Sequence, residues 1–146
     1  FVKNMSDASL TEDVGNGILE IAKQFELNAC VLLDLKNPKF TKYEGGNPYS
    51  WITGNNGEIT NLGDEIIVRK NVTLTRLATT KKKTMKLFTD SLNIFPNTEL
   101  VNTRSPIKII QEPNIEINGV GMEYDKKENT FKLLSNVKVH YEKIIK

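Results

Sequence analysis

The stretch Asn71-Val72-Thr73-Leu74-Thr75-Arg76 recurs 65 positions later as Asn136-Val137-Lys138-Val139-His140-Tyr141. The same spacing aligns Ile66 with Phe131, and the two copies need no gap. A fainter copy of the Lys-Asn pair lies 34 positions before Asn71, at Asn37. Repeats that each expose an apolar face must stack to bury it. The repeat therefore predicts an elongated β scaffold with a long internal face, rather than a compact enzyme with one cleft.

Short runs rich in Val, Ile, Leu, Thr, Phe and Tyr surround the repeat, separated by turn clusters such as Asn-Pro and Gly-Asn-Asn-Gly. This spacing is typical of an all-β protein. Along residues 131–140 most apolar side chains share one parity, and Lys132, Lys138 and His140 take the other, which places one face on a core. Ser105-Pro106 lies 34 positions after Asn71 and marks a further unit. We therefore expect repeated antiparallel strand units.

The N-terminal residues 1–17 are polar and end in Gly15-Asn16-Gly17, a turn signal. This pattern predicts a flexible, partly disordered arm over 1–17, followed by a single domain over 18–146. We favour a strand for residues 18–27. A helix is the alternative there, because four apolar residues also fall at helical spacing: Ile18, Ile21, Ala22 and Phe25.

Composition excludes several classes of protein. The 146 residues carry 20 Lys and Arg against 18 Asp and Glu, and the net charge of +2 is too small to indicate a nucleic-acid partner. The single cysteine, Cys30, excludes an intramolecular disulfide framework and a multi-cysteine zinc site. No apolar run approaches the roughly 20 residues of a membrane-spanning helix. Because Phe1 is not an initiator methionine, we expect a processed or trimmed chain.

Catalytic motifs are absent from the sequence. It has no phosphate loop of the P-loop type, no His-Glu-x-x-His and no Gly-x-Ser-x-Gly. We interpret His140 as a surface residue, Cys30 as a structural thiol and Gly119-Val120-Gly121 as a β-turn or bulge. Lys81-Lys82-Lys83 is interpreted as a solvated loop, with contact to anionic lipid or phosphate as the alternative. We expect no enzyme activity, no cofactor and no metal site.

An ordered series of motifs carries a family resemblance. It comprises Trp51 at a strand start, Asn71-Val72, residues 87–96, Thr103 with residues 106–109, residues 119–122 with Asp125, and residues 133–137 with Tyr141-Glu142. From about Leu32 to Glu142 this series resembles the LptC family of lipopolysaccharide-export proteins. The resemblance implies a twisted, open β-jellyroll in the periplasm. It also implies an N-terminal helix, missing from this chain, that anchors the domain in the inner membrane.

The resemblance further implies a non-catalytic transport function. The domain would accept lipopolysaccharide from the inner-membrane ABC transporter LptBFG and pass it to the bridge protein LptA. Acyl chains need such shielding, because each methylene exposed to water costs about 0.8 kcal/mol. We expect an apolar interior to line them with the side chains of Leu33, Leu35, Trp51, Ile66, Val68, Val72, Leu74, Leu92, Ile94, Ile107, Ile109, Ile115, Ile117, Phe131, Leu133, Val137 and Val139.

The handover would use the C-terminal strand. An open jellyroll ends in a strand with unpaired backbone groups, to which a partner of the same fold can add its own strand. The residues expected to dock LptA are Asn136, Val137, Val139, Tyr141 and Glu142.

Three alternatives stay open. The first is an LptA-like soluble bridge protein. The second is a solid-core β module for carbohydrate binding or interaction, for which the aromatic residues Tyr43, Tyr49 and Trp51 are the candidate cluster. In that case the alternating apolar residues form an ordinary core. The third concerns the partners of the chain, which include a second copy of itself in a weak homodimer.

Overall fold

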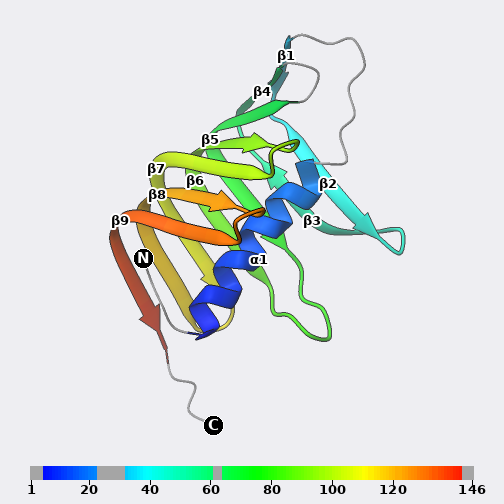
Figure 1. Ribbon diagram of the computed structural model, residues 1–146. Coiled ribbons are helices and arrows are strands. Elements are labelled where there is room, and N and C mark those ends of the chain that lie inside the picture. Colours follow the sequence, from blue (N-terminus) through cyan, green and yellow to red (C-terminus); the bar gives the residue numbers. More distant parts are fainter. Residues whose placement is uncertain (1–4, 23–31, 61–63, 143–146) are drawn as a thin grey trace.

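The computed structural model describes residues 5–22, 32–60 and 64–142. One helix, α1 (Met5–Ala22), precedes nine strands that form a single antiparallel sheet. The strands are β1 (Leu32–Lys36), β2 (Lys39–Glu44), β3 (Asn47–Thr53), β4 (Asn56–Thr60), β5 (Glu65–Arg76), β6 (Met85–Phe95), β7 (Leu100–Gln111), β8 (Ile115–Asp125) and β9 (Thr130–Tyr141). The predicted all-β class is thus confirmed, and α1 lies across one face of the sheet (Figure 1).

The sheet divides at β5. The first part of this strand pairs with β4, which pairs with β1, whereas residues 73–76 pair with β3, which pairs with β2. On its other edge β5 continues into β6, β7, β8 and β9 without branching. Because one long strand belongs to both branches, the sheet has two halves that share the strands β5 to β9. This arrangement is the open jellyroll that the sequence predicted.

A row of bends separates the two halves. The pairing register shifts between Arg69 and Val72 in β5, and similar shifts follow in the neighbouring strand pairs. The registers place the extra residues on alternate strands, around Asn71 in β5, Ser105 in β7 and Asn136 in β9. An extra residue in one strand of a pair bends that strand and increases its twist. The row therefore creates the fold line of the jellyroll.

The sequence repeat coincides with this row. Asn71 and Asn136 both have a positive φ, 52° and 51°, and Asn37, between β1 and β2, has a φ of 49°. Asparagine enters this left-handed region more readily than most residues. Between Asn37 and Asn71 lie β2, β3, β4 and the first part of β5. The repeated Asn therefore marks the break between β1 and β2 and the bends of β5 and β9.

A set of hydroxyl groups stabilises the bend from inside. The Ser91 hydroxyl lies 2.9 Å from that of Ser105 and 3.2 Å from that of Thr103. Thr89 donates to the carbonyl of Pro106 at 2.9 Å. Buried backbone groups that leave the sheet ladder need such partners. The hydroxyl groups thus satisfy polar groups at the fold line.

Helix α1 contradicts two predictions. Residues 5–17 form a helix rather than a flexible arm, and residues 18–22 continue it rather than forming a strand. The apolar side chains of α1 are buried against the sheet: Leu10, Val14, Ile18, Leu19, Ile21 and Ala22. Packing of an apolar face supplies most of the stability of a helix in a protein, and here it overrides the local turn signal. Residues 23–27 lie outside the described residues.

The Gly15-Asn16-Gly17 motif serves helix packing instead of a turn. A Cβ atom at Gly15 would overlap the ring of Tyr124 in β8. The Tyr124 hydroxyl donates to the side-chain oxygen of Asn16 at 2.7 Å. Glycine is therefore required where the helix backbone approaches the sheet closely.

Candidate functional site

The candidate lipid site is the apolar inner face of the sheet, which we call the trough. It holds eleven of the residues predicted to line the interior, each at most 5% exposed: Ile66, Val68, Val72, Leu74, Leu92, Ile94, Ile107, Ile109, Ile117, Phe131 and Leu133. They come from β5, β6, β7, β8 and β9, on both sides of the bend row. The strand alternation seen in the sequence thus brings them into one cluster.

The remaining predicted lining residues lie at the margins or elsewhere. Leu35, Ile115 and Val137 are partly buried against the core. The side chain of Leu33 lies outside the described residues. Trp51 was placed wrongly, because in β3 the neighbouring residues Ser50 and Ile52 are buried and Trp51 is only half-buried.

The outer position of Trp51 follows from strand alternation. Its ring lies 5.4 Å from the ammonium group of Lys39, an exposed residue of β2. Successive side chains of a strand point to opposite faces, so a buried Ile52 leaves Trp51 on the outer face. This short strand has too few alternating residues to indicate from the sequence which of its faces is buried.

The trough also contains residues that the sequence analysis missed: Phe40, Ile52, Ile59, Met85, Leu87, Val101, Met122 and Tyr124. Met85 and Leu87 alternate with Lys86, a signal that the sequence did contain. Phe40 and Ile59 belong to short strands, in which too few residues alternate to identify the inner face.

Helix α1 fills the trough. It contacts β2, β3, β5, β6, β7 and β9, so its axis crosses the strands (Figure 1). Its buried side chains pack in the same cluster as the predicted lining residues. The inner face is therefore covered by a segment of the same chain.

A buried arginine anchors α1 at the end of β5. Arg76 is 4% exposed, and its Nη1 atom lies 3.3 Å from a carboxylate oxygen of Asp13 in α1. Its Nη2 atom donates to the carbonyl of Lys83 at 3.0 Å. The Nε atom is buried and has no hydrogen-bond partner among the described residues. Lys82 adds a second cation, 2.9 Å from the other Asp13 oxygen.

A second ion pair holds the C-terminal part of α1. Lys42 in β2 lies 2.8 Å from Glu20 in α1 and 3.4 Å from Glu44. The hydrogen bond to Glu20 is the main cause that raises the pKa of Lys42 above its ordinary value, against the opposing effect of partial burial. Both ion pairs border a polar hollow of about 160 Å³ beside α1.

Tyr124 also contacts α1, and its hydroxyl has a raised pKa. Burial is the main cause that raises the pKa of its hydroxyl, and the nearby carboxylates of Glu12, Glu99 and Asp125 raise it further. The neutral hydroxyl can donate to Asn16, whereas a phenolate cannot. Protonated Lys42 and protonated Tyr124 thus contribute to the docking of α1.

The trough is open at the C-terminal end of β9. Val139 pairs with the buried Ile117, so the two side chains share the inner face, yet Val139 is 39% exposed. Tyr141 pairs with Ile115 and is 63% exposed. We call the four residues Ile115, Val137, Val139 and Tyr141 the apolar mouth. It leaves part of the inner face accessible to water.

Strand β9 is also an edge of the sheet. It pairs with β8, and no other described strand pairs with it. All five predicted docking residues lie on this strand or directly after it. The backbone N–H of Glu142 donates to the carbonyl of Asn114 at 2.9 Å, so the pairing with β8 extends past Tyr141.

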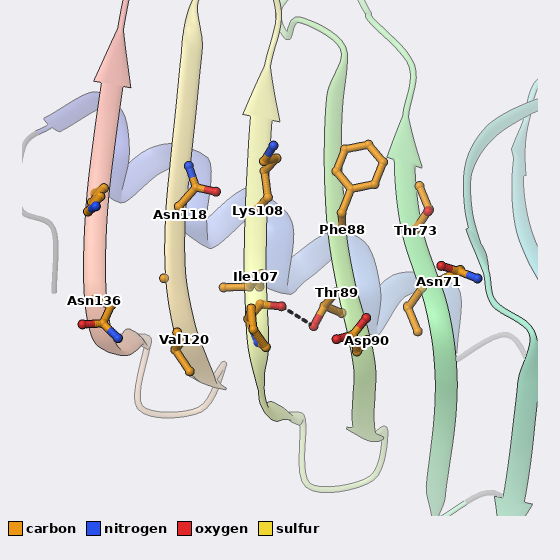
Figure 2. Close-up of a pocket in the computed structure, with 14 residues that line it drawn as sticks. Asn71, Thr73, Phe88, Thr89, Asp90, Ile107, Lys108, Asn118, Val120 and Asn136 are labelled. Atoms are coloured by element: carbon orange, nitrogen blue, oxygen red, sulfur yellow. Dashed lines mark hydrogen bonds between the residues drawn. The ribbon is translucent and has the colours of Figure 1, made fainter.

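The outer face carries a shallow depression of about 670 Å³ along the bend row. Figure 2 shows Phe88, Lys108 and Asn118 on this face, with α1 behind the strands. The part of the chain that the structure describes contains no group of His, Cys, Asp and Glu residues that could hold a metal ion. His140 is exposed, as predicted, and Cys30 lies outside the described residues.

A family model for LptC-related lipopolysaccharide-assembly proteins matches residues 24–142. The chain belongs to this family. The match confirms the resemblance inferred from the ordered motifs, and it begins after α1. Membership in the LptC-related family gives the chain a role in lipopolysaccharide transport. Proteins of this family are transport proteins and are not known as enzymes.

A solved structure supports the fold. LptH from Pseudomonas aeruginosa, described as the LptA-homologous periplasmic component of the lipopolysaccharide transport device, aligns with a TM-score of 0.50. The identity is 12%, and the alignment covers 79% of this chain and 94% of LptH. No curated protein matches the chain. In the described residues, no helix is long and apolar enough to cross a membrane.

Proposed function

We propose that this LptC-related chain binds lipopolysaccharide in the apolar trough and carries it across part of the periplasm. It accepts the lipid from the inner-membrane transporter LptBFG and passes it to the bridge protein LptA, and an N-terminal helix anchors it in the inner membrane. The observation that carries this proposal is the continuous apolar inner face that ends in the exposed mouth.

The physical argument rests on the acyl chains. Each methylene transferred from water to an apolar surface contributes about 0.8 kcal/mol, so an uncovered acyl chain crosses water only at a high cost. The trough offers aliphatic side chains from five neighbouring strands. The phosphorylated sugars stay outside in water, where their charges remain hydrated.

Transfer requires a second trough in line with the first. Strand β9 offers backbone groups along its outer edge, and a partner strand can extend the sheet there. The apolar mouth lies on the same strand, so an added jellyroll continues the inner face. The LptA-like bridge protein shares this geometry, and the family match favours the LptC-related role.

Photocrosslinking in cells tests the proposal. A photoreactive residue replaces Phe131 in the trough or Val139 in the mouth, and Lys138 on the outer face provides the control. We expect lipopolysaccharide adducts from the two inner positions alone. No adduct from either inner position, with the protein folded and its transport partners present, would favour a packed core with an interaction role.

A further inference from the structure

Helix α1 resembles an acylated, phosphorylated lipid in two respects: it has an apolar surface and a negatively charged group. Its apolar stripe lies where acyl chains are proposed to bind, and one of its carboxylates meets cations at the end of β5. The helix also lies before the part of the chain that the family model matches, residues 24–142. The trough and its present occupant are therefore separate parts of the sequence.

Arg76 is the group that needs an anion. A buried guanidinium without a carboxylate or phosphate partner is strongly unfavourable. Asp13 supplies one oxygen to Nη1 and its other oxygen to Lys82, while the Nε atom of Arg76 has no acceptor among the described residues. A phosphate monoester offers three acceptor oxygens to a guanidinium fork, against two from a carboxylate. The site formed by Arg76 and Lys82 thus has a hydrogen-bond donor, the Nε atom of Arg76, that Asp13 does not engage.

The helix is suited to displacement. Gly15 and Gly17 each lower its intrinsic helix stability relative to alanine. Isolated helices of this length are marginal in water, so α1 depends on the trough for its structure. A ligand that takes the trough therefore removes the main contacts that keep α1 helical.

We propose that α1 is a built-in substitute for the lipid. Its apolar face fills the acyl-chain site, and the Asp13 carboxylate occupies a subsite, formed by Arg76 and Lys82, for a phosphate monoester on the lipid headgroup. This inference rests on the proposed function. Binding of the lipid displaces α1, and release of the lipid allows α1 to return. Only molecules with an undocked α1 can bind the lipid. The apparent affinity for the lipid is therefore the intrinsic affinity multiplied by the fraction of molecules in which α1 is undocked.

The first test compares Asp13→Asn with Glu12→Gln. Both changes remove one carboxylate from α1, but only Asp13 pairs with Arg76 and Lys82. We expect Asp13→Asn to bind lipopolysaccharide about tenfold more tightly than the unchanged chain, equivalent to about 1.4 kcal/mol. Glu12→Gln should leave the affinity within about twofold. Equal affinities of Asp13→Asn and the unchanged chain would overturn the proposal.

The second test examines the cations. Lys82→Gln removes one member of the subsite, and Lys81→Gln removes the exposed neighbour as a matched control. Because Lys82 also holds α1 through Asp13, the readout is the ratio of the affinity for lipopolysaccharide to that for the same lipid after enzymatic removal of its phosphates, and we expect Lys82→Gln to lower this ratio. An equal loss for both lipids would show that no phosphate subsite exists there. The control should bind both lipids like the unchanged chain.

Hydrogen–deuterium exchange measures displacement directly. Saturating lipopolysaccharide should accelerate exchange in residues 10–22 while β6 and β7 stay protected. Binding without faster exchange in α1 would overturn this inference and leave the proposed function intact. No lipid binding by any variant would instead overturn the proposed function. Inorganic phosphate alone should not release α1. If it does, the site formed by Arg76 and Lys82 binds free phosphate, and its proposed role in binding the lipid headgroup is overturned.

Discussion

Asn71 and Asn136 occupy equivalent bends in β5 and β9 with nearly the same positive φ. Their 65-residue spacing reveals the repeat, and the bend gives the repeat its physical cause. A side chain branched at Cβ fits this backbone region poorly, whereas asparagine and glycine tolerate it. The sequence therefore indicated the places where every second strand bends, although not the direction of the bend.

Asn71→Val should destabilise the protein by about 1–2 kcal/mol, because valine in the left-handed region places Cβ too close to the following carbonyl. Asn71→Gly should change the free energy of unfolding by less, since glycine has no Cβ. Urea denaturation of both variants measures the difference. Equal stability of the valine and glycine variants would mean that the backbone at this bend relaxes freely.

Gly15→Ala and Gly17→Ala form a matched pair within α1. Alanine raises helix propensity by about 0.5–1 kcal/mol at either position. At Gly17 no atom lies within 4 Å of the added Cβ, so we expect a net gain in stability. At Gly15 the Cβ would overlap the Tyr124 ring, and we expect a net loss of about 1–3 kcal/mol. Thermal and urea unfolding check both signs; a gain at both sites would argue against close contact of α1 with β8.

At the scale of elements, α1 is the part that the sequence predicted least, because a helix was only the alternative for residues 18–27 and residues 1–17 were expected to form an arm. Its central Gly-Asn-Gly favours a turn, but burial of the apolar face of α1 against the sheet overrides that signal. The long strands were predictable, because alternation over ten or more residues identifies the inner face. The short β3 was not, and Trp51 was assigned to the wrong face for that reason. The apolar inner face could therefore be predicted from the sequence, whereas the helix that covers it could not.

Docking of α1 should weaken as pH rises. Lys42 and Tyr124 both have a pKa above their ordinary values of 10.5 and 10.0. A raised pKa in the folded state means that the stabilisation is complete below the unfolded pKa and is lost as pH rises through the folded pKa. We expect the helical circular-dichroism signal of α1 to fall only above about pH 10.

Tyrosine absorbance at alkaline pH supplies the control for this titration. Tyr124 should ionise above the ordinary tyrosine pKa, and Tyr124→Phe should remove that late component. Loss of the α1 signal while Tyr124 is still protonated and Lys42 still charged would show that other contacts govern docking.

The mouth on β9 provides a test of transfer. Val139→Asp and Tyr141→Asp place a charge on the exposed inner face, whereas His140→Asp places it on the outer face of the same strand. All three should change stability by no more than about 0.5 kcal/mol, because these positions are exposed. We expect only the first two to reduce transfer of lipopolysaccharide to LptA in a reconstituted assay. A similar reduction by His140→Asp would indicate a general charge effect on the edge strand.

At the scale of the whole molecule, the sheet has a large apolar face that one helix covers. The all-β class was accessible from the sequence because it depends on repeated strand patterns, and the jellyroll and the family were accessible through the resemblance of the ordered motifs to LptC proteins. The position of α1 on the sheet was not predictable from the sequence. It depends on which segment of the chain fits an apolar surface that several strands form together. Contacts between distant parts of the chain leave no local signature in the sequence.

Removal of residues 1–22 should expose the inner face. We expect stronger binding of a hydrophobic dye and self-association, and restoration of a monomer by a mild detergent that covers the apolar surface. Analytical ultracentrifugation and dye fluorescence with and without detergent measure the effect. Unchanged dye binding in the shortened chain would mean that the two halves of the sheet close upon each other without the helix.

The row of bends acts as a crease across the long strands. Each strand from β5 to β9 crosses it, so the spread between the halves is set along one line of residues rather than by each strand independently. The hydroxyl groups of Ser91, Thr103 and Ser105 fasten the crease at its centre. The separation of the two halves of the jellyroll is thus determined by all the strands together. If it increases at one strand, it must also increase at the neighbouring strands.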